Sequence, residues 1–199
     1  MCNSSICINR LRSHSFGFSL IEMMVVVLIM GVLLAVGGPS LNVYMTNNKI
    51  QATAQSFVSG LQQARGEAVR RNGNVNFILT DGAIDVATST PDAAGKNWMV
   101  TAPVLDAPTT IEIINSKSAN EGSANKVTIG GGVASVTFNS LGGTNLGAAA
   151  QYTFGFDGLT CGTATRCLSV VVTPGGRTQL CDPAVPATAL GDSRRCITS

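Results

Sequence analysis

The first clear pattern along the chain is an apolar run that reaches from Phe18 to Gly38. It holds 21 residues, and Glu22 is the only charge in it. At 1.5 Å per residue, a helix of this length extends about 32 Å, which matches the hydrocarbon core of a bilayer. The run therefore predicts a membrane-spanning helix.

A second helical pattern follows an interruption at Gly37, Gly38 and Pro39. Proline removes a backbone donor and crowds the preceding turn, so a kink is expected there. Apolar residues then recur at helical spacing, at Ala54, Phe57, Val58, Leu61, Ala64 and Ala68. We expect one long helix whose second half packs on a domain and ends near Asn72 and Gly73, because glycine readily adopts the left-handed conformation.

Beyond this helix, apolar and polar residues alternate with the period of β-strands. The alternation begins at residues 75–79, and Asp81 with Gly82 predicts a tight hairpin turn into a strand at residues 84–86. Further short strands are expected at residues 98–101, 110–114, 126–129, 135–138, 152–156, 168–173 and 178–181. The predicted fold class is α+β, a long N-terminal helix packed on antiparallel sheets.

Composition narrows the class of function. Apolar residues make up 45% of the 199 residues and charged residues 12%, so part of the chain is expected to lie in lipid or in an assembly. The single histidine, His14, lies in a segment that we expect to be removed, which excludes histidine catalysis and histidine metal ligands from the remaining chain. Losing Arg10 and Arg12 from 13 basic residues leaves 11 against 11 acidic ones, so no broad attraction for nucleic acid is built into the whole protein.

Two glycine-rich stretches, residues 130–132 and 142–147, fit neither the dinucleotide nor the Walker spacing and are interpreted as loops. No cofactor is expected.

The six cysteines fall into two groups. Cys2 and Cys7 lie at the start of the chain, and four lie in its last quarter: Cys161, Cys167, Cys181 and Cys196. An even set at one end of a membrane-crossing chain favours two disulfides in an oxidising compartment. A zinc site needs closer pairs than the intervals of 5, 13 and 14 residues found here, so no metal is expected.

Four cysteines allow three pairings. We favour Cys161 with Cys167 and Cys181 with Cys196, because each pair joins sequence neighbours across a loop of glycine, proline or small residues. The second bridge would bring Arg194 and Arg195 near the turn at Arg177.

The segment before the apolar run is polar and contains Arg10 and Arg12. It lacks the apolar core that an ordinary secretory signal carries before its cleavage site. Positive charge before the run and none just after it places the N-terminus in the cytoplasm and the rest of the chain outside.

The junction at the start of the run reads Gly17-Phe18-Ser19-Leu20-Ile21-Glu22. It resembles the cleavage and methylation site of type IV pilins and type II secretion pseudopilins. The resemblance implies that a prepilin peptidase cuts after Gly17 and methylates the new N-terminus at Phe18. Pro39 falls at position 22 of such a mature chain, where members of this family often carry proline.

Glu22 also has a physical interpretation. A carboxylate in the apolar part of a membrane helix costs about 2.5–3.5 kcal/mol on insertion scales, so a functional partner is expected. The candidates are the amine of Phe18 one helical turn away, or the Phe18 amine of a neighbouring subunit, a charge pair that would set axial register. The alternative is that Glu22 merely lies at headgroup depth.

Residues 64–75 resemble the end of the first helix in the GspH/FimT group, and residues 138–143, 173–177 and 192–196 resemble its C-terminal strands and cysteine-closed tail. The resemblance implies a non-enzymatic minor pilin or pseudopilin that helps to initiate a filament near its tip. Its partners would be other minor pilins or pseudopilins, the major pilin or pseudopilin, and inner-membrane lipid. The expected organisation is a leader at 1–17, a membrane or filament-core half-helix at 18–44, and a periplasmic domain at 45–199.

Some members of the group capture DNA for uptake through a Gly-Arg-x-Arg element. Here the stretch reads Gly176-Arg177-Thr178-Gln179, so the second arginine is missing. Residues 161–199 still hold four arginines against two aspartates, which leaves Arg177, Arg194 and Arg195 as candidate DNA contacts. A solvated tail beside a disulfide explains the same charges.

A third hypothesis is an enzyme anchored by one helix. It finds no nucleophile motif and no closely spaced carboxylate pair. The sequence thus favours a filament subunit, with a DNA receptor at the pilus tip as the alternative.

Overall fold

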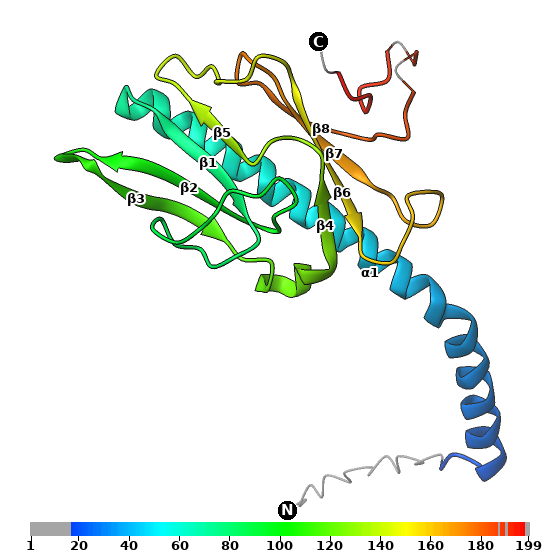
Figure 1. Cartoon of the computed structure of the whole chain (residues 1–199). Helices are drawn as coiled ribbons and strands as arrows, with labels where there is room; N and C mark the ends of the chain where they lie inside the picture. Colours follow the sequence, from blue (N-terminus) through cyan, green and yellow to red (C-terminus); the bar gives the residue numbers. More distant parts are fainter. Residues whose placement is uncertain (1–16, 187, 190, 198–199) are drawn as a thin grey trace, which may run out of the picture. The chain divides into compact units, whose positions relative to one another are not determined.

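The computed structural model describes residues 17–186, 188–189 and 191–197, without the side chains of residues 35–40 and 122–124. The expected leader, apart from Gly17, lies outside this part, as do its cysteines and its histidine. The chain divides into two units, residues 1–41 and 42–199. Each unit is described separately below, with the elements labelled in Figure 1.

A single helix, α1 (Leu20–Arg71), begins in the first unit and ends in the second. Its backbone is helical through Gly37, Gly38 and Pro39, so the expected long helix is present. The kink at Pro39 remains a prediction, and the side chain of Pro39 lies outside the described part.

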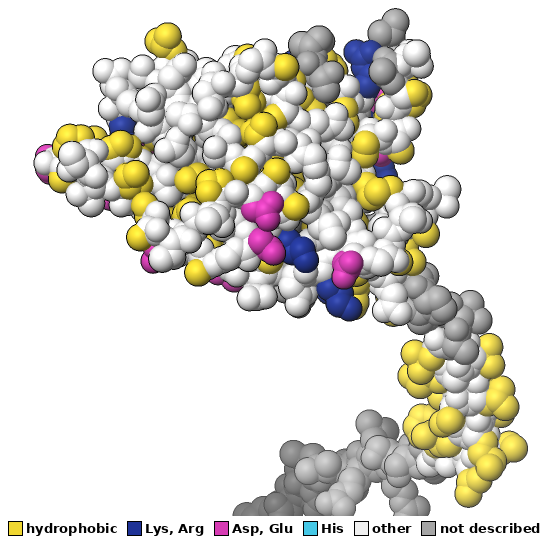
Figure 2. Space-filling view, in the orientation of Figure 1, with side chains coloured by type: hydrophobic (Ala, Val, Ile, Leu, Met, Phe, Trp, Pro, Cys, Tyr) yellow, Lys and Arg dark blue, Asp and Glu magenta, His cyan; other side chains and the backbone are white. Residues whose placement is uncertain are grey.

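In the first unit, α1 is exposed on all sides. Every described side chain from Phe18 to Leu34 is exposed, and hydrophobic side chains cover this part of the helix in Figure 2. Among the residues whose side chains the structure describes, no helix has an apolar stretch of sufficient length to cross a membrane.

The second unit contains two four-stranded antiparallel sheets. The first has the order β3-β2-β1-β5, formed by β1 (Val75–Thr80), β2 (Asn97–Val104), β3 (Ala107–Lys117) and β5 (Ser135–Phe138). The second has the order β4-β6-β7-β8, formed by β4 (Val127–Gly130), β6 (Ala150–Phe156), β7 (Leu168–Val172) and β8 (Thr178–Cys181). A 3-10 helix, η1 (Glu121–Lys126), precedes β4. The predicted α+β class is confirmed.

The apolar stripe of α1 forms the centre of the core. Its buried members are Ile50, Ala54, Phe57, Leu61, Ala64 and Ala68. The ring of Phe57 lies 4.8 Å from Phe77 of the first sheet. It also lies 4.9 Å from Tyr152 and 5.2 Å from Phe154 of the second sheet. One side chain of α1 thus contacts both sheets.

Tyr152 is the largest fully buried side chain in this core. Its hydroxyl donates a hydrogen bond to the carbonyl oxygen of Val133 at 3.0 Å. Burial raises the pKa of Tyr152 to about 12, and the backbone hydrogen bond opposes this shift. The phenol is therefore held neutral and its polar atom is satisfied.

The end of α1 is close to the predicted position but uses a different residue. Asn72 takes the left-handed conformation, with φ of 49°. Its N–H donates to the carbonyl of Val69 at 3.2 Å, and the N–H of Gly73 donates to that of Ala68 at 3.1 Å. These two bonds form a Schellman motif, in which asparagine is the usual substitute for glycine.

The last turn of α1 is tied to the β2–β3 hairpin by charge. Arg71 bonds Glu112 of β3 at 2.6 Å and Glu67 of its own helix at 3.0 Å, and it donates to the carbonyl of Pro103 at 3.1 Å. The hydrogen bond that Arg71 donates to Glu112 is the main cause of the raised pKa of Arg71. The bond from Arg70 is the main cause of the lowered pKa of Glu67.

The predicted hairpin at Asp81 and Gly82 is wrong. β1 pairs with β2 instead, and residues 83–96 form a loop between them. The carboxylate of Asp85 accepts hydrogen bonds from the N–H groups of Ala87 and Thr88, a local turn that competes with strand pairing. The chain then returns beside β1, where the N–H of Asp92 donates to the carbonyl of Leu79 at 2.9 Å.

Two helical glycines of α1 are predicted to respond oppositely to alanine. A Cβ at Gly60 would lie 2.9 Å from ring atoms of Phe77 and Trp98, whereas nothing lies within 4 Å of a Cβ at Gly66. We expect Gly60→Ala to destabilise the fold by about 1–3 kcal/mol through overpacking. Gly66→Ala should stabilise it by about 0.5–1 kcal/mol through helix propensity. Denaturant unfolding of the full chain in detergent measures both, and equal effects would contradict the packing described here.

Candidate functional site

The processing junction is open in the structure. Gly17, Phe18 and Ser19 belong to no helix or strand and are exposed. Among the residues that the structure describes, nothing lies within 4 Å of a Cβ built on Gly17, so packing in this part of the chain does not demand glycine there.

Glu22 occupies the first turn of α1 and is exposed. The N–H of Met23 donates to the carbonyl of Ser19 at 3.2 Å, which makes Ser19 the N-cap residue and Glu22 the third helical residue. This Ser-x-x-Glu spacing is that of a capping box, a feature that our sequence analysis missed. Phe18 precedes the helix, so its pairing with Glu22 within one subunit remains a prediction.

The four C-terminal cysteines form two disulfides, Cys161–Cys167 and Cys181–Cys196. These are the pairs that the sequence favoured over the two other pairings. The first bridge closes the loop before β7, and the second joins the end of β8 to the tail. Among the residues that the structure describes, no cluster of three or more histidine, cysteine or acidic residues could hold a metal ion.

Asp182 organises the region between the two bridges. Its carboxylate accepts a hydrogen bond from the N–H of Ala184 at 3.0 Å and pairs with Arg166 at 3.2 Å. Its own N–H donates to the carbonyl of Arg194 at 2.7 Å. The side chain of Asp182 is 12% exposed. Because Asp182 contacts both Arg166 and the backbone of Arg194, it connects the first disulfide loop to the tail.

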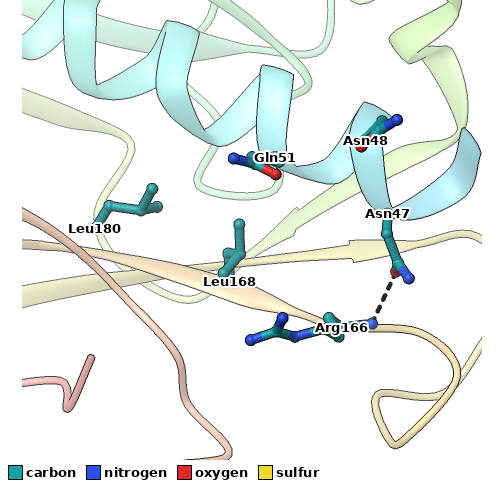
Figure 3. A pocket seen from close by; sticks show the side chains of 6 residues that line it. All are labelled: Asn47, Asn48, Gln51, Arg166, Leu168 and Leu180. Atoms are coloured by element: carbon teal, nitrogen blue, oxygen red, sulfur yellow. Dashed lines mark hydrogen bonds between the residues drawn. The ribbon is translucent and has the colours of Figure 1, made fainter. Parts of the chain in front are cut away.

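Asn47 of α1 fixes the same disulfide loop from the other side. Its amide donates to the carbonyl of Ala164 at 3.0 Å and accepts from the N–H of Arg166 at 2.9 Å. Figure 3 shows this contact at the rim of a hollow of about 370 Å³, with Leu168 and Leu180 contributed by β7 and β8. The two bonds join residues more than 100 positions apart, and no sequence pattern indicated them.

The three candidate DNA-binding arginines differ in their surroundings. Arg177 is exposed and donates to the side-chain oxygen of Gln179 at 3.4 Å. The amide of Gln179 donates to the carbonyl of Arg195 at 3.1 Å. Gln179, which replaces the second arginine of the family element, thus joins the Arg177 turn to the tail.

Arg194, unlike Arg177, forms an ion pair with an acidic side chain. It pairs with Asp192 at 2.8 Å, with a second hydrogen bond at 3.1 Å. The hydrogen bond from Arg194 lowers the pKa of Asp192, and Asp192 raises the pKa of Arg194. Of the three candidate arginines, Arg194 therefore has its charge balanced by an acidic neighbour.

Comparisons with known proteins concern both the Gly17–Phe18 junction and the C-terminal domain. The family model described as type II transport protein GspH matches residues 53–176, more than half of the chain. The chain belongs to the GspH family. The model of the prokaryotic N-terminal methylation motif matches residues 12–38 of this GspH-family chain, which include the Gly17–Phe18 junction and Glu22. The comparison with curated proteins gives no match.

A solved structure supports the fold assignment. The crystal structure of the type IV minor pilin FimU from Pseudomonas aeruginosa aligns with a TM-score of 0.52 and 18% identity, and it covers 72% of this chain and 97% of FimU. A second crystal form of FimU aligns with a TM-score of 0.47 and 19% identity, and it covers 69% and 97% of the two chains. The first alignment shows that this GspH-family chain has a pilin-like fold.

Asn47→Ala is predicted to loosen the first disulfide loop. The two lost hydrogen bonds should reduce the free energy of unfolding by about 1–2 kcal/mol and speed amide hydrogen exchange at residues 162–166. The neighbouring Asn48 is exposed, so Asn48→Ala should change stability by less than about 0.5 kcal/mol. Equal exchange rates in the two variants would show that Asn47 does not hold the loop.

Proposed function

We propose that the chain is a non-enzymatic minor pilin or pseudopilin subunit of a type IV pilus or type II secretion filament, acting in filament initiation near the tip. The observation that carries this proposal is the continuity of α1. One helix connects the methylation motif at residues 12–38 to the GspH domain at residues 53–176. A processing site and a compact domain on one helix suit a subunit that is cut before it is assembled.

The apolar half of α1 supports the location that we propose. Its described side chains from Leu20 to Leu34 are exposed in the isolated chain. Each Å² of such surface removed from water contributes about 25 cal/mol, so the segment has a strong tendency to be covered. We propose that residues 18–44 lie in the inner membrane before assembly and against other subunits afterwards, with the domain at 45–199 in the periplasm.

Glu22 is the proposed assembly residue within this segment. Its position as the third residue of α1 favours a carboxylate, because the helix N-terminus carries partial positive charge. Glu22 could cap the helix start, or it could form a charge pair with the Phe18 amine of a neighbour. The two roles require different properties of the side chain. Capping needs only a hydrogen-bond acceptor, whereas register in a filament needs the negative charge.

DNA capture at a pilus tip is the alternative function. Its support is the exposed Arg177, connected through Gln179 to the tail at Arg195. The pairing of Arg194 with Asp192 weakens it. Whether neighbouring genes encode competence proteins or secretion components separates the two functions.

Processing after Gly17 is the first test of the proposal. Protein extracted from membranes of the native host should begin at Phe18 and carry an N-methyl group, as read by N-terminal mass spectrometry. Gly17→Val should block processing, because a side chain would have to fit where the peptidase accepts none. Gly31→Val, at an exposed glycine inside the apolar run, should be processed normally. Wild-type protein that begins at Met1 would contradict the proposal.

Substitution of Glu22 separates its two roles. Glu22→Gln keeps an acceptor for the helix start but removes the charge, so it should insert into the membrane normally and enter filaments poorly. Glu22→Ala should also insert, because it removes a costly charge, and should assemble no better. Crosslinking to neighbouring subunits measures incorporation. If Glu22→Gln crosslinked to neighbouring subunits as well as the wild type does, the charge-pair role would be rejected and only the capping role would remain.

A further inference from the structure

A groove of about 570 Å³ lies between the last turns of α1 and the start of β8. Its lining residues are Gln62, Arg65, Gly66, Val69, Arg177 and Thr178. The helical members recur at intervals of three and four, so they form one face of α1. The loop after β5 and the turn before β8 lie at this same end of the domain (Figure 1).

Two glycine turns pack against Arg65. A Cβ at Gly142 would lie 3.0 Å from Nε of Arg65, and one at Gly176 would collide with the carbonyl oxygen of Gly142 and lie 3.2 Å from the same Nε. Both glycines have φ of 77°, where other residues are strained. The N–H of Thr144 donates to the carbonyl of Pro174 at 2.8 Å and so ties the two turns together. The backbone of the two turns thus packs closely together and lies against the guanidinium of Arg65.

Among the described residues, no ion pair neutralises the charge of this groove. Arg70, Arg71, Arg166 and Arg194 each pair with an acidic side chain. In the part of the chain that the structure describes, Arg65 and Arg177 form no ion pair. No acidic residue is among those that line the groove. Two guanidinium groups therefore face a common space without a counter-charge.

The border of the groove is apolar and open. Val69, which lines the groove, is 53% exposed, and Leu141, next in sequence to the Gly142 that packs on Arg65, is 90% exposed. Gly66 lies in the helical face with nothing within 4 Å of a Cβ. Glycine inside a helix costs about 0.5–1 kcal/mol relative to alanine, and packing in the described part of the chain does not account for Gly66. Close approach of another molecule would.

We propose that this groove binds a side-chain carboxylate of a neighbouring filament subunit, with an adjacent apolar side chain against Val69 and Leu141. The inference rests on the proposed function. Two arginines suit one carboxylate, because each guanidinium can donate paired hydrogen bonds to it. Binding along a DNA backbone neutralises many phosphates, and the exposed apolar border offers nothing to them. The chemistry of the groove thus favours a protein partner.

The test uses the full chain in its native host, with a photo-crosslinking residue in place of Gln62. In the filament fraction, mass spectrometry should map the crosslink to a peptide of another subunit that contains aspartate or glutamate. Arg65→Gln with Arg177→Gln should reduce this crosslink about tenfold, the loss expected for a charge-assisted contact. Arg70→Gln, one turn away, is the matched control and should reduce it little. Arginine in place of the partner's acid, combined with Arg65→Glu, should restore it.

Gly66→Leu supplies a second variant that does not depend on charge. It should fold at least as stably as the wild type, since leucine is a better helix former, yet lose the crosslink because its side chain fills the groove. Unchanged crosslinking in the double arginine variant, a partner peptide without an acid, or crosslinks to DNA would each overturn the inference. Wild-type protein missing from filaments would instead remove the proposed function on which it rests.

Discussion

The structure of the domain depends on the burial of one face of α1 between two sheets. Phe57 contacts aromatic rings of β1 and β6, so the helix serves as the common core of both sheets. Replacing such a buried ring by alanine typically costs about 3–5 kcal/mol. Because the helical face repeats every three to four residues, the same contact fixes which residues of α1 remain outside. Gln62, Arg65 and Gly66 are exposed for this reason.

The disulfides and hydrogen bonds of the C-terminal region extend this arrangement. Asn47 and Asp182 hold the first disulfide loop from two sides, and Gln179 joins the Arg177 turn to the tail. Irregular backbone is thereby fixed beside α1 without a large core of its own. A 16-residue closure such as that between Cys181 and Cys196 contributes about 3 kcal/mol in the chain-entropy estimate.

The sequence predicted those features that have a local period or composition. The apolar stripe of α1 and most strands were predictable because burial imposes spacings of 3.6 and 2 residues. The hairpin at Asp81 failed because the sequence did not show that Asp85 would form a local turn and that β1 would pair with β2. The packing of two glycine turns against Arg65 was not predictable, because Gly142 and Gly176 are far apart in the chain. The sequence showed Gln179 only as a departure from the family's Gly-Arg-x-Arg element. In the structure its amide joins the Arg177 turn to the tail at Arg195.

The central claim is that the mature chain is a filament subunit. The most direct measurement examines filaments sheared from the native host, with gold-labelled antibodies against the domain at residues 42–199 and mass spectrometry of the same fraction. The account predicts a chain that begins at N-methylated Phe18, labelled at filament ends and much scarcer than the major subunit. Label confined to membrane or soluble fractions, with none on filaments, would contradict it.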